Sequence, residues 1–134
     1  MMTRRSFVIN IFGTTAAFML TLIGCRDKVS SKTSALYLPE FLSIIIDEKT
    51  IRDIGMAYIS FAPNQTTESF LISKLMTDVN GNKLSRTSSA SNISAELRKK
   101  IIQDYQKEQY LFVDGWVLSE TEAQQCALFS LSQK

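Results

Sequence analysis

Residues 110–118 read YLFVDGWVL and form the densest apolar stretch after residue 25. Asp114-Gly115 lies between two apolar triplets and permits the tight turn of a β-hairpin near 111–118. Arms this short are not stable as an isolated ribbon, so an extended connector is the alternative. The residues that follow, Ser119-Glu120-Thr121-Glu122, have the pattern of a capping box and predict a last helix through Ala123, Cys126, Ala127 and Leu131.

Further short helices are expected upstream of this stretch. Pro39 and Glu40 suit the first turn of a helix whose apolar residues would be Phe41, Leu42, Ile44, Ile45 and Ile46. A second helix is expected to start at Thr50 and to end near Pro63, and a third to run from 65 to 77. The sequence therefore predicts a mainly α fold, a small bundle of four or five short helices that follows an N-terminal signal or anchor segment.

The fourth expected helix has the clearest periodicity, with Ser94 as its cap. Its apolar face would hold Ile93, Leu97, Ile101, Ile102 and Tyr105. Its solvated side would hold Arg98, Lys99, Gln103, Asp104 and Lys107. The basic cluster at 98–100 would suit lipid head groups, but a solvated helix face is the preferred interpretation of such a run of charge.

Between the third and fourth helices, residues 78–92 are polar and rich in Ser and Asn. A segment with so few apolar residues cannot fill a core, and we expect a mobile loop. Residues 78–82, DVNGN, resemble the start of a calcium loop. They lack the acidic residue that would close one, which favours a turn.

The first 25 residues have the three parts of a bacterial export signal. Arg4, Arg5 and Phe7 match the twin-arginine pattern, an uncharged run extends from Ser6 to Gly24, and LIGC at 22–25 resembles a lipoprotein processing box. We therefore expect a signal peptide at 1–24, a lipid on Cys25, a polar tether at 25–34 and a helical domain at 35–134. The alternatives are export by the general secretory route and an uncleaved transmembrane helix.

Composition argues against several classes of function. Lys and Arg number 15 and Asp and Glu 13, so the chain without Arg4 and Arg5 has no net charge and no basic footprint for nucleic acid. The absence of histidine removes the usual general base and the commonest zinc ligand. No glycine-rich dinucleotide fingerprint follows an expected strand, so we expect this chain to bind no flavin or other cofactor itself.

The remaining candidates for function are aromatic. Tyr110, Phe112, Trp116 and Val117 would form a partner-binding surface, because aromatic side chains concentrate binding energy. The alternative for Trp116 is that it fills the core of a small domain. Asp114 is expected to serve the turn, and Cys126 to be a small buried hydrophobe that has no disulfide partner if Cys25 carries lipid.

Residues 113–119 (VDGWVLS), 121–123 (TEA) and 126–128 (CAL), together with the arginine pair, resemble a known family. It is the small-subunit family of membrane-bound FAD-containing D-sorbitol dehydrogenase, and the chain resembles the related gluconate 2-dehydrogenase subunit 3 less closely. The resemblance implies a non-catalytic accessory subunit that uses the twin-arginine export machinery, with FAD and the substrate chemistry on a large partner subunit. It would lie in the cell envelope, lipid-anchored on the periplasmic side. The alternative is a stand-alone envelope lipoprotein with a binding or structural role.

Overall fold

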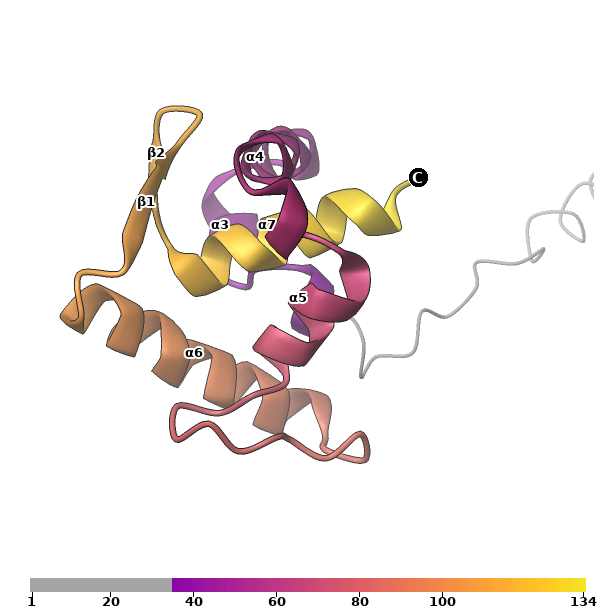
Figure 1. Ribbon diagram of the computed structural model, residues 1–134, viewed down its shortest axis with the longest axis vertical. Helices are drawn as coiled ribbons and strands as arrows, with labels where there is room; N and C mark the ends of the chain where they lie inside the picture. Colours follow the sequence, from indigo (N-terminus) through magenta and orange to yellow (C-terminus); the bar gives the residue numbers. More distant parts are fainter. Residues whose placement is uncertain (1–34) are drawn as a thin grey trace, which may run out of the picture.

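The computed structural model describes residues 35–134, which form a helical bundle with one hairpin (Figure 1). After a helical turn at 35–37 come α3 (Leu42–Ile45), α4 (Glu48–Phe61), the 3-10 turn η1 (Pro63–Gln65), α5 (Glu68–Leu75) and α6 (Ala90–Gln106). The antiparallel strands β1 (Tyr110–Val113) and β2 (Trp116–Ser119) lead into α7 (Glu120–Ser132). The predicted mainly α fold and the hairpin are confirmed. The export residues Arg4, Arg5 and Phe7, the lipidation residue Cys25 and the 25–34 tether lie outside the described residues.

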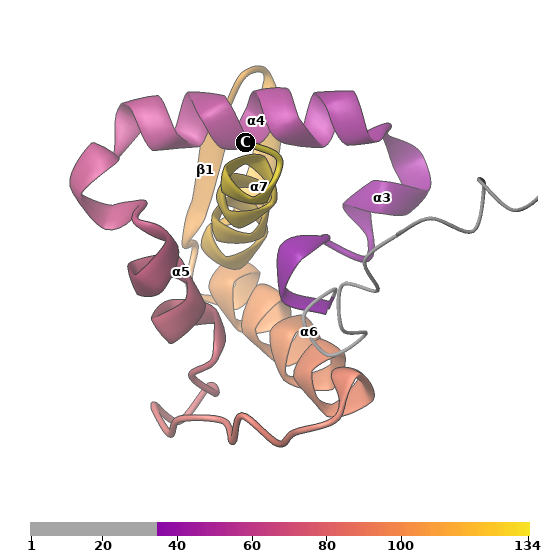
Figure 2. The same cartoon turned by 90° about the vertical axis from the view of Figure 1, so that its right-hand side faces the viewer.

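Helix α7 occupies the centre of the molecule. It passes beneath α4, with α5 on one side, the α3 segment on the other and α6 below (Figure 2). Every residue from Thr121 to Ser130 is buried, including polar ones. The polar side chains are satisfied by hydrogen bonds: Gln125 donates to the carbonyl of Ala35 at 3.2 Å, and Ser130 donates to that of Arg52 at 2.8 Å. The last helix therefore holds together segments from the whole described chain.

Two helices start earlier than the sequence analysis expects. Asp47, three positions before the expected start at Thr50, is the N-cap of α4, because its carboxylate accepts from the backbone N–H of Thr50 at 2.8 Å. Ser89 caps α6 in the same way through Asn92, so the predictions of Thr50 and Ser94 as starts were wrong. The loop expected at 78–92 consequently ends at Ser89.

The buried stripe of α6 also differs from the prediction. Ile93, Leu97 and Asp104 are buried, whereas Ile102 and Tyr105, assigned to the apolar face, are exposed. Asp104 was expected in solvent, but Thr121 donates to its carboxylate from both the backbone N–H at 2.9 Å and the hydroxyl at 2.6 Å. These two bonds offset the cost of burying a carboxylate.

Within α6, Lys100 is also less solvated than the predicted charged face implies. Its ammonium donates to the carbonyl of Lys74 at 2.5 Å, close to the carboxyl end of α5. Burial lowers the pKa of Lys100. Lys100 therefore ties α5 to α6.

The first and third expected helices are shorter than predicted. Only Leu42 of α3 is buried, while Phe41, Ile44 and Ile45 are exposed. Of the helix expected at 65–77, only Glu68–Leu75 is helical as α5, because Thr67 caps its start by accepting from the N–H of Phe70. Leu71 and Leu75 are the residues of α5 that reach the core.

The segment at 78–82 forms the expected turn. The carboxylate of Asp78 accepts from the N–H groups of Asn80 and Asn82, each at 2.8 Å, and Gly81 has a φ of 86°. Within residues 35–134, no group of three or more His, Cys, Asp or Glu side chains is placed to hold a metal ion. The helices of that same part are all too short or too polar to cross a bilayer.

Candidate interaction surface on the hairpin

The hairpin turns at Asp114-Gly115. Both residues have positive φ, 49° and 83°, which is the backbone of a type I′ turn and matches the twist of the flanking strands. The register pairs Phe112 with Val117 and Leu111 with Leu118. Asp114 is therefore a turn residue, as expected.

Alternation along the strands gives the hairpin two different faces. Leu111, Val113, Trp116 and Leu118 lie on the inner face and pack in or against the hydrophobic core. The exposed side chains of the other face, which we call the outer face, are Tyr110, Phe112 and Val117. These three side chains are 42%, 79% and 49% exposed. An exposed apolar strand face of this kind is typical of an interaction site.

Of the four predicted partner-binding residues, the structure brings three together and separates the fourth. Tyr110 and Phe112 make an edge-to-face aromatic contact with ring centroids 6.4 Å apart, and Val117 lies opposite Phe112. Trp116 is half-buried on the inner face. The alternative considered for Trp116, packing against the core, therefore describes its position.

A hydrogen-bond network holds the base of the hairpin to α6 and α7. Glu122 accepts from the N–H of Ser119 and from the Tyr105 hydroxyl, each at 2.9 Å, and Ser119 accepts in turn from the N–H of Glu122. This is the predicted capping box with a tyrosine added. Burial and the hydrogen bond to the Glu122 carboxylate raise the pKa of Tyr105 from 10.0 to about 12, so the hydroxyl remains a donor even at pH values where an ordinary tyrosine ionises.

Tyr105 and Ile102 of α6, both expected on the apolar face of that helix, lie at the surface instead. They are 41% and 58% exposed and lie one turn apart on α6. Their exposure follows from the register of α6, which buries Leu97 and Asp104 instead. Recognition of Ser89 as the cap would have predicted the longer helix. The burial of Asp104, however, could not be predicted from the residues around it in the sequence.

Cys126, the one thiol of the described residues, is unsuited to act as a nucleophile. Its side chain is fully buried, and this burial, together with the negative charge of Glu122, raises the pKa of the thiol to about 12. At neutral pH the group is a neutral core side chain, as expected.

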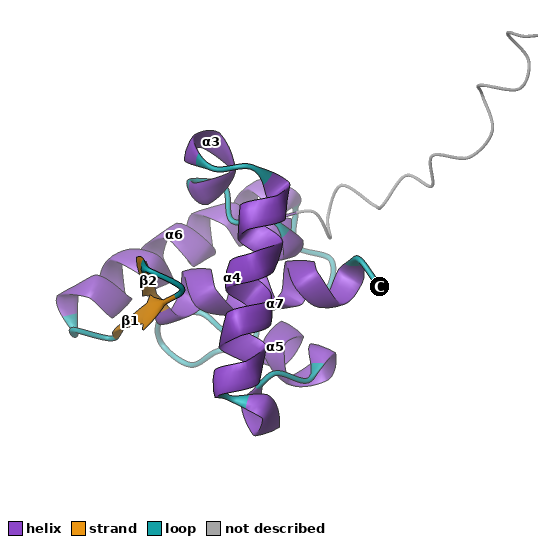
Figure 3. Cartoon of the chain, turned by 90° about the horizontal axis from the view of Figure 1, so that it is seen from above, coloured by secondary structure: helices purple, strands orange, loops and turns teal. Residues whose placement is uncertain are grey.

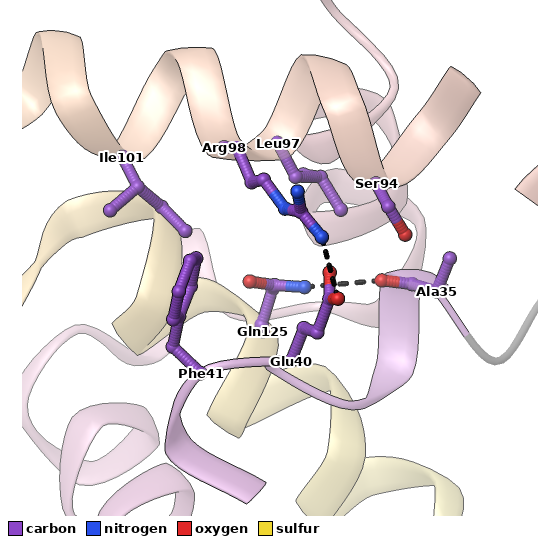
Figure 4. Close-up of a pocket in the computed structure, with 8 residues that line it drawn as sticks. All are labelled: Ala35, Glu40, Phe41, Ser94, Leu97, Arg98, Ile101 and Gln125. Atoms are coloured by element: carbon purple, nitrogen blue, oxygen red, sulfur yellow. Dashed lines mark hydrogen bonds and ion pairs between the residues drawn. The ribbon is translucent and has the colours of Figure 1, made fainter. Parts of the chain in front are cut away.

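A pocket lies between the first residues of the domain, α6 and α7 (Figure 4). The space inside is about 10 Å³, enough for about one water molecule. Its lining residues are Ala35, Glu40, Phe41, Ser94, Leu97, Arg98, Ile101 and Gln125. A substrate or cofactor does not fit there, and the pocket is better described as a packed seam.

No family profile, curated protein or solved structure matches this chain.

Proposed function

We propose that this chain is a non-catalytic accessory subunit that escorts and anchors an exported FAD-dependent sugar or alcohol dehydrogenase. In this proposal the large subunit binds FAD and substrate, and the small subunit supplies the twin-arginine signal of Arg4 and Arg5 and a lipid on Cys25. The observation that carries the proposal is the outer face of the hairpin, where apolar side chains stand in solvent on a rigid base.

The geometry of the outer face suits protein docking. The hairpin projects from one side of the bundle, and its inner face and base are fully used by the fold (Figure 3). Tyr110, Phe112 and Val117 are not part of the hydrophobic core, so they are available to contact another protein. Rigid aromatic side chains lose little entropy on binding and commonly dominate interface energetics.

The experiment is coexpression with a candidate FAD-dependent oxidoreductase large subunit, followed by affinity capture through a tag on the small chain. We expect capture of a flavin-containing large subunit and loss of that capture in Phe112→Ser. Phe61→Ser is the matched control, because Phe61 is also 79% exposed but lies at the end of α4.

If Phe112→Ser captured as much large subunit as the wild type, the outer face of the hairpin would not be part of the interface. Recovery of the small chain alone, folded and monomeric in the presence of the oxidoreductase, would contradict the accessory role. That second result would instead favour a stand-alone envelope lipoprotein.

A further inference from the structure

The start of the described domain is firmly attached to α6 and α7. Gln125 of α7 donates to the Ala35 carbonyl at 3.2 Å, and Arg98 of α6 forms an ion pair with Glu40 at 2.6 Å (Figure 4). The guanidinium of Arg98 also lies 5.7 Å from the ring centroid of Phe41. The point where the chain enters the domain therefore lies against α6 and α7.

Three apolar side chains project from this attached segment. Phe41, Ile44 and Ile45 are 53%, 77% and 69% exposed, and we call them the α3 knob. Leu42, between them, is buried and fixes the turn to the core. The knob is separate from the hairpin, which lies on another part of the surface (Figures 1 and 3).

The position of the knob in the chain indicates what covers it. Cys25 precedes Ala35 by ten positions, so a lipid on Cys25 keeps Ala35 within about 35 Å of the bilayer whatever path the chain takes. The knob follows Ala35 by six to ten positions, so it belongs to the part of the domain that the tether enters. This step rests on the lipid attachment in the proposed function.

The chemistry of the knob fits an uncharged lipid surface. The cations near it are paired, Arg98 with Glu40 and Lys49 with Asp53, so neither is free to recognise anionic head groups. The exposed carboxylates Asp47 and Glu48 follow the knob and would also repel an anionic surface. Three apolar side chains can enter a bilayer surface without a partner surface of complementary shape.

We propose that the α3 knob inserts into the surface of the bilayer that holds the N-terminal lipid and thereby orients the domain. Alone, so small an apolar group binds weakly, but a lipid on Cys25, 16 to 20 positions before the knob, makes its insertion an intramolecular step with a high effective concentration. The domain would then present a constant side to the membrane.

The test uses the full chain in vesicles of phosphatidylcholine whose acyl chains carry bromine, a contact quencher of tryptophan. The chain has one tryptophan, so Trp116→Phe provides a silent background. Ile44→Trp then reports on the knob, and Phe61→Trp is the control, because Phe61 is similarly exposed at the opposite end of α4. Circular dichroism checks that each variant keeps its helices.

We expect strong quenching of the tryptophan at 44 and little at 61, unchanged by salt. Equal quenching at both positions would overturn the inference, because the domain would then have no preferred orientation. Absence of quenching at 44 in vesicle-bound protein would overturn it while leaving the proposed function intact, which the capture experiment tests separately. Failure of the full chain to remain with the vesicles would overturn both the inference and the lipid anchor. A dimer that disappears in the double variant Ile44→Ser/Ile45→Ser would overturn the inference and assign the knob to a second copy.

Discussion

At Gly55, the absence of a side chain lets α4 approach the backbone of α7 at their crossing (Figure 3). A Cβ at this position would overlap the carbonyl oxygen of Cys126 and the hydroxyl of Ser130. Ser130 uses that hydroxyl to bond both helices, so the neighbours have little freedom to move. Gly55 thus sets the separation of the two helices.

We predict that Gly55→Ala lowers the free energy of unfolding by about 1–3 kcal/mol, the usual range for overpacking a core. Helix propensity acts in the opposite direction and would favour alanine by about 1 kcal/mol. Urea denaturation followed by circular dichroism measures the difference. Met56→Ala, on the exposed side of α4, is the control and should change stability little. If Gly55→Ala stabilised the protein, α4 and α7 would have room for a methyl group where they cross.

Burial of the Cys126 thiol should make the stability of the protein depend on pH at alkaline pH. Burial raises the thiol pKa from 9.0 to about 12 in the folded protein, so between these values the unfolded chain releases a proton that the folded chain keeps. The free energy of unfolding should therefore fall as pH rises from about 9 to 12, with no contribution from this group below that range. Comparing denaturation of wild type and Cys126→Ala across this range isolates the thiol. The free energy of unfolding should decline more steeply with pH in the wild type than in Cys126→Ala. Identical slopes would show that the thiol does not contribute.

At the scale of elements, the start of α7 is capped twice. Its own Ser119 and Glu122 form the capping box, and Asp104 of α6 accepts from the N–H and hydroxyl of Thr121. The second cap joins two helices, so it contributes to packing as well as to the helix end. The carboxylate also lies at the positive end of the α7 dipole.

We expect Asp104→Ala to destabilise the protein by about 1–3 kcal/mol, because it leaves a buried N–H and hydroxyl without their acceptor. Asp53→Ala is the matched control. Asp53 is half exposed and forms only a surface ion pair with Lys49, which is worth less than about 1 kcal/mol. Chemical denaturation should rank the two variants in this order. Equal effects would mean that water replaces the Asp104 carboxylate.

At the scale of the whole molecule, α7 is the helix against which the other elements pack. It contacts α4, α5, α6 and both strands, so none of these elements has a core without it. We predict that Leu128→Ala, a fully buried truncation in α7, costs about 2–5 kcal/mol. Helix circular dichroism and the fluorescence of Trp116 in the hairpin should be lost in one coincident transition.

Val117→Ala serves as the control for that variant. Val117 lies in the same hairpin as Trp116 but on its exposed outer face, and its truncation should change stability little. Separate transitions for the hairpin and the helices in Leu128→Ala would show that the bundle does not depend on α7 as a whole.

Several features were predictable from short pieces of sequence. The type I′ turn requires positive φ, which Asp114-Gly115 supplies, and the capping box needs only Ser119 and Glu122 at the correct spacing. The helical class follows from periodicity in the same way. All of these depend on preferences and donors within a few residues of one another.

Other features depend on residues that are distant in the chain. Asp104 is buried and Ile102 exposed because Thr121 provides partners for the carboxylate, and Gln125 of α7 bonds Ala35, 90 positions away. Helix α7 has no polar side because neighbours surround it completely, so periodicity could not assign it a face. Local sequence therefore accounts for the type of each element and its turns. Long-range packing alone selects the buried faces, the two sides of the hairpin and the exposed α3 knob, because burial is a property of neighbours and not of spacing.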